Sequence, residues 1–367
     1  MRGGAAPRRG APRGFTLVEL MVALVVSSLL VGMSFAIFIR MSVAYRGQQQ
    51  VAEVQSKLAA ARAKIELDAK QAGLYMADGF HLASQGGGLR WSPLRVVNDA
   101  DGPDEVAFYY ADTSAQVATR VTGGAGTTCN RRECDRLGAT DGFAAGDVVV
   151  MSTVSWAHLP DHPGPKEAKV AEFEACLLQL ASVGPGAFVF SEAPPWGTPG
   201  NVHCPKDPAV GTTMFYKLAA RRWRIDPARP ADGVLQLSTL GGLIGVDDWQ
   251  DQAYGFTDLQ VATRFFESAS QRAWSSGEQQ EVDTAPAAAF KAPIQISISL
   301  VARTERDVEG IASSSTPNLT VAGSEDHNPI GDRGPIPLPS TLPALSGHRI
   351  FRHATFQLDL RNLGVGR

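Results

Sequence analysis

The hydrophobic residues of this chain are concentrated in one run near its start. The segment from Leu20 to Ile39 holds 20 uncharged, mostly apolar residues, and Glu19 is the only charged residue between Arg13 and Arg40. At about 1.5 Å per residue, a helix of this length measures about 30 Å, which matches the hydrocarbon core of a bilayer. The pattern therefore predicts one membrane-spanning helix.

A helical pattern continues after this run. Apolar residues recur every three or four positions at Val51, Val54, Leu58, Ala61 and Ile65. We expect one apolar face to pack on a partner, and the polar remainder to face solvent: Gln48 to Gln50, Lys57, Arg62, Lys64 and Asp68. Gly73 is a plausible C-terminal stop. The sequence thus predicts a nearly continuous helix of about 87 Å from Phe15 to Ala72, with a bend or local melting at Gly32 and Gly47.

From about residue 89, short β-branched runs separated by Gly, Pro and Asp replace the helical period. These runs predict strands at Glu105–Ala111, Asp147–Ser155, Gly186–Phe190, Thr213–Leu218, Arg222–Ile225, Val234–Ser238, Leu259–Phe266, Ile294–Arg303 and Ile350–Leu360. Residues 270–289 and 311–347 are polar or rich in Pro and Gly, which indicates flexible loops. The expected fold is α+β: a long N-terminal α-helix, half membrane-spanning and half amphipathic, packed on a mostly antiparallel β-sheet head with long loops.

Composition and charge exclude several function classes. The chain of 367 residues is 44% hydrophobic, and its 34 Lys and Arg residues nearly balance 37 Asp and Glu residues, for a net charge of −3. No chain-wide positive field is available for nucleic acid, so we expect no nucleic-acid partner. Four Cys and seven scattered His indicate neither a disulfide-dense scaffold nor a His-rich metal protein.

The chain starts with a basic leader that contains Arg2, Arg8, Arg9 and Arg13, and the string GFTLVEL follows at residues 14–20. This string resembles the prepilin signature of type IV pilins and type II secretion pseudopilins, with Gly before the cut, Phe after it and Glu as the fifth mature residue. A plain single-pass anchor whose Glu19 lies at the interface by accident is the alternative. The positive-inside rule keeps the leader in the cytoplasm and sends the head outward.

The resemblance implies how the N-terminus is processed and used. A prepilin peptidase would cut between Gly14 and Phe15 and methylate the amine of Phe15. Glu19 would then pair with the terminal amine of a neighbouring subunit, since a carboxylate in a bilayer is costly unless paired. The expected domains are a cleaved leader (1–14), a transmembrane and assembly helix (15–39), an amphipathic stem (40–73) and a periplasmic head (74–367). Loss of the four leader Arg residues would leave a net charge of −7.

Several runs in the head resemble PilW-type minor pilins, namely residues 101–110, 146–152, 257–266, 296–304 and 351–362. This resemblance implies a minor pilin that primes pilus assembly, lies at the pilus tip, and supports adhesion or twitching motility. The implied partners are other minor pilins, the major pilin, the assembly platform, a tip adhesin and the bacterial inner membrane, with the subunit extracellular once in the pilus. A type II secretion pseudopilin and a membrane-anchored periplasmic binding or enzymatic domain are the alternatives.

Four cysteines fit two disulfides in an exported head. Three pairings are allowed, and we expect Cys129–Cys134 and Cys176–Cys204, because each closes a loop between predicted strands without entangling them. Structural zinc needs four closely paired ligands, and only one close Cys pair is present. We therefore expect no metal.

No other motif in the chain carries chemistry. Residues 98–105, NDADGPDE, lack the ligand spacing of a calcium loop and are better explained as a turn that enters a strand. The glycine clusters at 86–88 and 123–124 lack the context of a phosphate-binding loop, and no nucleophile or metalloprotease constellation appears. We discount the glycosylation sequon at Asn318 because the prepilin signature points to prokaryotes. The expectation is a protein with no cofactor and no catalysis of its own.

Overall fold

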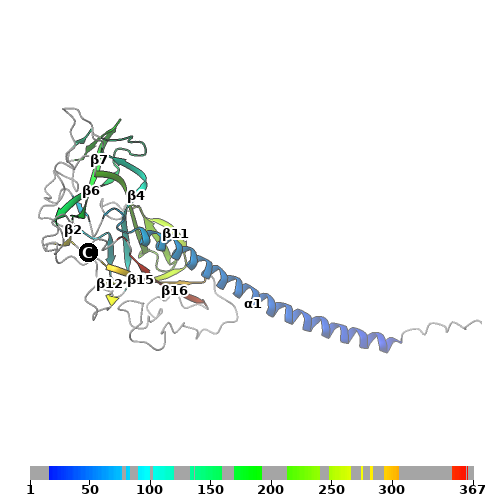
Figure 1. Ribbon diagram of the computed structural model, residues 1–367. Coiled ribbons are helices and arrows are strands. Elements are labelled where there is room, and N and C mark those ends of the chain that lie inside the picture. The colour runs from blue at the N-terminus through cyan, green and yellow to red at the C-terminus, as the bar shows by residue number, and fades with distance from the viewer. Residues whose placement is uncertain are drawn as a thin grey trace, which may run out of the picture.

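One long helix and a β-rich head make up the molecule, and most of the helix projects away from the head (Figure 1). The computed structural model describes residues 16–76, 80–82, 90–99, 102–119, 133–135, 137–158, 169–191, 213–239, 248–265, 274–275, 282–283, 293–305, 349–360 and 362. The expected α+β fold, a long N-terminal helix packed on mostly antiparallel sheets, is confirmed.

The elements follow one another in a simple order. They are α1 (Leu17–Gln71), β1 (His81–Leu82), β2 (Arg90–Trp91), β3 (Leu94–Val97), β4 (Glu105–Ala118), β5 (Glu133–Cys134), β6 (Val148–His158), β7 (Lys169–Gly184), β8 (Ala187–Phe190), β9 (Thr213–Ile225), β10 (Val234–Ser238), β11 (Gln250–Tyr254), β12 (Phe256–Phe265), β13 (Trp274–Ser275), β14 (Val282–Asp283), β15 (Pro293–Arg303) and β16 (Phe351–Asp359).

Helix α1 is continuous over 55 residues, or about 82 Å. It ends at Gln71, and Gly73 follows with a φ of 78°, so the predicted stop is confirmed. The expected melting at Gly32 and Gly47 is wrong, because the helix passes through both glycines without interruption. One glycine costs a helix about 1 kcal/mol, which the neighbouring turns of a long helix can offset.

Only the second half of α1 packs on the head. Val54, Leu58, Ala61 and Ile65 are buried, as the apolar spacing predicts. The prediction that Asp68 faces solvent is wrong, since its side chain is only 7% exposed. It lies three residues after Ile65 and therefore on the buried face. The preceding part of the helix, from residue 17 to residue 53, is exposed or half-exposed, and its residues 17–45 project about 44 Å.

Two main sheets form the head in the described part of the chain. Ten strands make one sheet along the path β11-β10-β9-β6-β7-β8-β5, with β1, β3 and β4 attached beside it. Four strands make the other, in the order β13-β12-β15-β16, and β2 pairs with β14. Every described pairing is antiparallel except that of β1 with β7.

Every predicted strand has an observed counterpart, but two predicted runs are one strand, and several observed strands, among them β3, β7 and β11, were not predicted. The two runs predicted at 213–218 and 222–225 form the single strand β9. The 16-residue strand β7 was not predicted, because charged residues interrupt its apolar pattern. Within the predicted loop 270–289, residues 274–275 and 282–283 are short strands. Its other residues and the predicted loop 311–347 lie outside the described part.

A glycine corner joins the two sheets. Gly255 separates β11 in the larger sheet from β12 in the smaller one and has a φ of 89°. A Cβ there would lie 2.9 Å from the backbone oxygen of Arg303, so only glycine allows this close approach. The corner turns the chain from one sheet to the other beside the stem.

The largest core lies where α1 meets both sheets. It combines the buried face of α1 with side chains of β3, β4, β9, β10, β12, β15 and β16, including Phe108, Trp223 and Phe356. A second core, around Phe143, Phe188 and Phe215, lies between strands at the far end of the larger sheet. We call the part of the head built around this second core the distal lobe. It contains no residue of the stem.

Candidate functional site

The start of α1 carries a reciprocal hydrogen-bonded cap. The backbone N–H of Glu19 donates to the Thr16 hydroxyl oxygen over 3.2 Å, and the Thr16 N–H donates to Glu19 Oε2 over 3.0 Å. This arrangement is a capping box, which satisfies helix N–H groups that would otherwise lack acceptors. The predicted assembly residue Glu19 therefore also stabilises the beginning of its own helix.

The predicted processing residues Gly14 and Phe15 lie outside the described residues. The expected cut lies one residue before Thr16, the N-cap of a helix whose first turns lie far from the head (Figure 1). The structure places Glu19 on the first turn after this point, with its side chain exposed. Glu19 therefore lies at an end of the helix that nothing in the described head covers, and the expected cut is four residues before it in the sequence.

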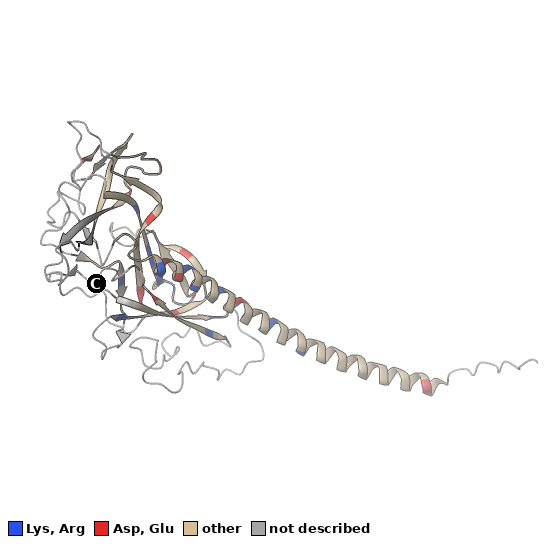
Figure 2. Ribbon diagram, viewed as in Figure 1, with Lys and Arg blue, Asp and Glu red and all other residues tan. Residues whose placement is uncertain are grey.

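The projecting half of α1 can lie in lipid. Its apolar side chains from Leu17 to Ile39 are 50–76% exposed, and the segment is long and apolar enough to cross a membrane. Figure 2 shows this half nearly free of charged residues. The hydroxyls of Ser27, Ser28 and Ser34 donate to backbone oxygens one turn earlier over 2.8–3.0 Å. These serines therefore leave no hydroxyl proton unsatisfied in a bilayer.

The stem is attached to the head through a buried acid. Tyr110 Oη donates to Asp68 Oδ1 over 3.1 Å, and Trp223 Nε1 donates to Asp68 Oδ2 over 2.9 Å. Burial raises the pKa of Asp68, while these two hydrogen bonds and the nearby charges of Arg221 and Lys64 act in the opposite direction. Burial and the charge of Asp68 raise the pKa of Tyr110 to about 12, so Tyr110 remains a donor.

Polar contacts at the rim support the same attachment. Lys57 forms ion pairs with Glu53 over 2.9 Å and with Glu305 at the end of β15. Lys64 donates to Gln252 Oε1 of β11 over 3.0 Å. Exposed ion pairs contribute about 0–1 kcal/mol each, so the buried face of the stem dominates the attachment.

A groove of about 430 Å³ lies beside this rim, where the stem leaves the head. Its walls come from α1 on one side and from the end of β15 on the other. The lining residues are Arg46, Gln49, Gln50, Glu53, Val54, Lys57, Thr304 and Glu305. The two cations and two carboxylates of this lining balance in charge, so the groove has no strong preference for a charged ligand.

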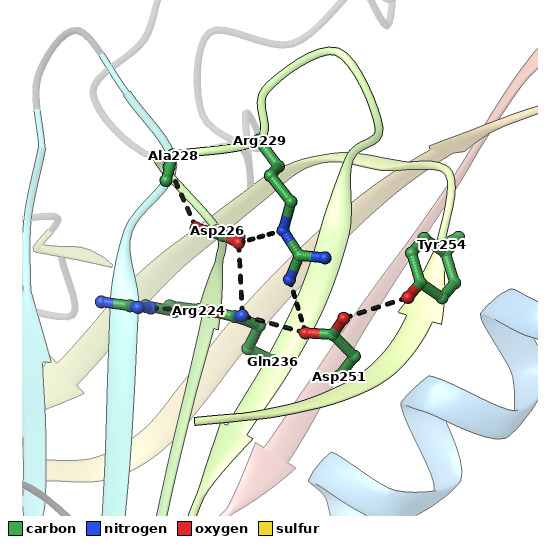
Figure 3. A network of polar contacts seen from close by, with 7 residues as sticks. All are labelled: Arg224, Asp226, Ala228, Arg229, Gln236, Asp251 and Tyr254. Carbon is green, nitrogen blue, oxygen red and sulfur yellow. Dashed lines mark hydrogen bonds and ion pairs between the residues drawn. The ribbon is translucent and has the colours of Figure 1, made fainter. Parts of the chain in front are cut away.

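A closed polar network braces the turn between β9 and β10 (Figure 3). Arg229 binds Asp226 over 2.6 Å and Asp251 over 2.7 Å, and Gln236 Nε2 donates to Asp251 over 3.0 Å. These hydrogen bonds hold the pKa of Asp251 well below its usual range. The acids and the arginine satisfy one another, so the network stabilises β10 and β11 beside the stem and leaves no open catalytic group.

The predicted disulfides are tested only in part. Cys134 and Cys176 are fully buried in the distal lobe, and neither is a free thiol. Cys129 and Cys204 lie outside the described residues, so the pairings Cys129–Cys134 and Cys176–Cys204 stay predictions. Among the described residues, no group of three or more His, Cys, Asp or Glu side chains is placed to hold a metal.

The acidic segment before β4 forms structural contacts. Asp104 is 1% exposed and accepts the backbone N–H of Val261 over 2.8 Å and that of Asp99 over 3.0 Å. The bond from Val261 joins the segment to β12, and the bond from Asp99 closes the turn itself. Both carboxylate oxygens of Asp104 thus have backbone donors, in agreement with the interpretation as a turn that enters a strand.

Sequence reasoning missed the Asp68 contact, although a signal was present. Val54, Leu58, Ala61, Ile65 and Asp68 follow one another at intervals of three or four residues. An acid on such a stripe must be buried and must find donors. The donors come from β4 and β9, far away in the sequence, and no local pattern identifies them.

Comparison with known proteins gives one match. A family described as the prokaryotic N-terminal methylation motif matches residues 10–35, the region that contains Gly14, Phe15 and Glu19. Searches of curated proteins and of solved structures found no match. The chain is therefore a type IV pilin-like or pseudopilin-like protein at its N-terminus, and proteins of this kind are typically structural rather than enzymatic.

Proposed function

We propose that this protein is a minor pilin of a type IV pilus, similar to the PilW type, which primes pilus assembly and lies at the pilus tip. In this role it supports adhesion or twitching motility through other subunits, without catalysis of its own. The observation that carries the proposal is the helix α1, whose exposed apolar half projects beyond the head and carries Glu19 on its first turn, within the matched methylation motif.

The apolar half of α1 suits two environments in turn. In the inner membrane it faces lipid, with the head in the periplasm. During assembly it exchanges lipid for the helices of neighbouring subunits, which also bury apolar side chains. The 20 uncharged residues from Leu20 match the bilayer, and the six residues from Arg40 to Tyr45 then form a short stalk of about 9 Å before the helix reaches the groove at Arg46.

Glu19 selects the axial position of an incoming subunit. After prepilin peptidase cuts between Gly14 and Phe15, the methylated amine of Phe15 carries a positive charge. The carboxylate of Glu19 on an adjacent helix pairs with it, because both charges are otherwise costly away from water. An incoming helix that slides by one turn loses this pair, so the pair favours one register over others.

The shape of the head supports a position at the end of a fibre. The distal lobe extends the head on the side away from the stem, and its core is separate from the core that holds the stem (Figure 1). A large head of this kind is difficult to repeat along a fibre and easier to place at its tip. There it would contact the other minor pilins, the major pilin, the assembly platform and a tip adhesin.

Deletion of the gene tests this function. We expect loss of surface pili, restored by the unaltered gene, because a priming subunit is needed before the major pilin can assemble. Labelling of purified pili should then place this subunit at fibre ends. Unchanged piliation, or uniform labelling along the fibre, would reject the priming role. Loss of protein secretion with normal piliation would instead favour a type II secretion pseudopilin.

A further inference from the structure

The buried face of α1 contains one charged residue among its described buried positions. Its other members are the apolar residues Val54, Leu58, Ala61, Ile65 and Ala69. Asp68 lies between Ile65 and Ala72, both of which are at most 1% exposed. The carboxylate therefore lies within an otherwise apolar contact between the stem and the head, near the end of the helix.

The partners of Asp68 are hydrogen-bond donors held rigidly by the sheet. Trp223 is 1% exposed and Tyr110 is 7% exposed, and they come from the paired strands β9 and β4. Each carboxylate oxygen receives one side-chain donor, at 3.1 and 2.9 Å. Both donors are uncharged, so the direct contacts supply hydrogen bonds and no ion pair.

A buried carboxylate with uncharged partners stabilises the folded state less than an apolar side chain would at the same position. Taking a carboxylate out of water is costly, and uncharged donors return only part of that cost. Burial accordingly raises the pKa of Asp68, despite the opposing charges of Arg221 and Lys64. An apolar side chain at position 68 would carry no desolvation cost. Ile65 and Ala72 show that apolar side chains pack on the head at this face.

The apolar stripe by itself does not define one docked position. A slide of one turn, about 5.4 Å, would bring Leu58 to the place of Val54, Ile65 to that of Ala61 and Ala69 to that of Ile65, and only Arg62, in the place of Leu58, would oppose it. The same slide would separate Asp68 from Tyr110 and Trp223. One charge and two donors would then be buried without partners, which is strongly unfavourable.

We propose that Asp68 is the residue that fixes the rotation and axial position of the stem on the head, through its paired hydrogen bonds to Tyr110 and Trp223. The apolar stripe supplies the attachment, and Asp68 selects one register at a cost to stability. The register decides how the head is oriented about the stem, and therefore which face of the head meets a neighbouring subunit. The claim concerns a single subunit and goes beyond the proposed function.

The test measures the distance between stem and head in the full-length chain in detergent micelles. Spin labels are attached to cysteines introduced at Ala52 on the stem and Asp141 on the head, both exposed. Pulsed electron-spin measurements then give the distribution of distances. The unaltered chain should give one narrow distance.

Asp68→Leu removes the two hydrogen bonds to Tyr110 and Trp223 and keeps a side chain of similar size. We expect a broadened or shifted distance distribution with an unfolding midpoint equal to or above that of the unaltered chain. Asp68→Asn retains one acceptor oxygen and should restore most of the original distance. Leu58→Ala is the matched control within the same face: its midpoint should fall while the distance stays narrow.

Two results would overturn the proposal. The first is a narrow, unshifted distance in Asp68→Leu, whatever its midpoint. The second applies if Asp68→Leu fails to fold, as judged by the loss of its β-sheet circular dichroism. In that case Tyr110→Phe and Trp223→Phe, which each remove one donor and keep a ring, should both broaden the distance, and unchanged distances in both would reject the proposal.

Discussion

At the scale of single residues, Glu19 has two uses that exclude each other in part. In the isolated subunit, its Oε2 atom accepts the Thr16 N–H and the Thr16 hydroxyl and so caps the helix. In a fibre, the same carboxylate would pair with the amine of Phe15 on a neighbour. A capping box is worth about 1 kcal/mol, which a charge pair away from water can exceed.

Glu19→Gln separates the two uses. Glutamine can still complete the capping box, but it carries no charge to pair with an amine. We expect normal helix formation and normal membrane insertion, with surface pili reduced at least about tenfold, because loss of an interaction worth 1.4 kcal/mol already changes an equilibrium tenfold. Electron microscopy of surface pili gives the measurement. Glu53→Gln on the exposed stem is the control and should leave piliation unchanged.

Asp68 gives a pH-dependent prediction. Its pKa is raised above the usual value of 3.8, so the folded state binds a proton more tightly than the unfolded state does. The contribution of Asp68 to stability is therefore fully present below pH 3.8 and is lost as the pH rises through its folded pKa. Tyr110, with a pKa of about 12, does not titrate in this window.

The measurement compares urea midpoints of the unaltered chain and Asp68→Asn between pH 7 and pH 4. Glu66, Asp112 and Asp226 have lowered pKa values, so acidification also removes their contributions to the stability of both proteins. Only the difference between the two proteins therefore isolates Asp68. At pH 7 we expect Asp68→Asn to have the higher urea midpoint, because asparagine carries no buried charge. This difference in midpoint should shrink as the pH falls and Asp68 takes up a proton. An advantage that stays constant or grows would contradict a raised pKa.

The residues of the N-terminal motif were predictable and those of the stem contact were not. Gly14, Phe15 and Glu19 stand within six consecutive positions, so a local pattern suffices. The Asp68 contact joins residues 42 and 155 positions apart, and depends on how β4 and β9 pair. Physical chemistry requires a buried acid to have donors, but only the fold identifies them.

At the scale of elements, the stem helix is stabilised by the face that it buries. Leu58 is 4% exposed within the core shared by α1 and both sheets, whereas Leu67 on the same helix is 59% exposed. We predict that Leu58→Ala lowers the free energy of unfolding by about 2–5 kcal/mol, from lost burial and the cavity left behind. Leu67→Ala should change it by less than about 0.5 kcal/mol. Chemical denaturation in detergent measures both, and equal effects would contradict the observed docking face.

The helix and most strands followed from periodicity, and the exceptions have physical causes. The last part of β16 shows the alternation of a strand with one buried face, because Phe356, Leu358 and Leu360 lie in the core shared with the stem while Gln357 and Asp359 are exposed. Strand β7 was missed because its first half, KVAEFEA, carries charges that weaken a strand pattern. Its pairing with β6 over eleven residues shows that a long antiparallel partner can outweigh this local weakness.

At the scale of the whole molecule, three zones follow one another along an extended shape (Figure 1). The apolar half of α1 is suited to lipid or to other helices, the stalk separates it from the head, and the distal lobe lies away from the stem. The layout explains why average composition is uninformative here: the apolar surface is collected on one projecting helix. It also leaves the start of α1, which follows the expected processing site, uncovered by the described head.

The measurement that tests the central claim most directly is mass spectrometry of the mature N-terminus, on protein purified from membranes of cells that contain a prepilin peptidase. The account predicts a chain that lacks residues 1–14 and begins with N-methylated Phe15 followed by Thr16. A chain that begins with Met1 or Arg2, or with an unmethylated Phe15, would contradict it.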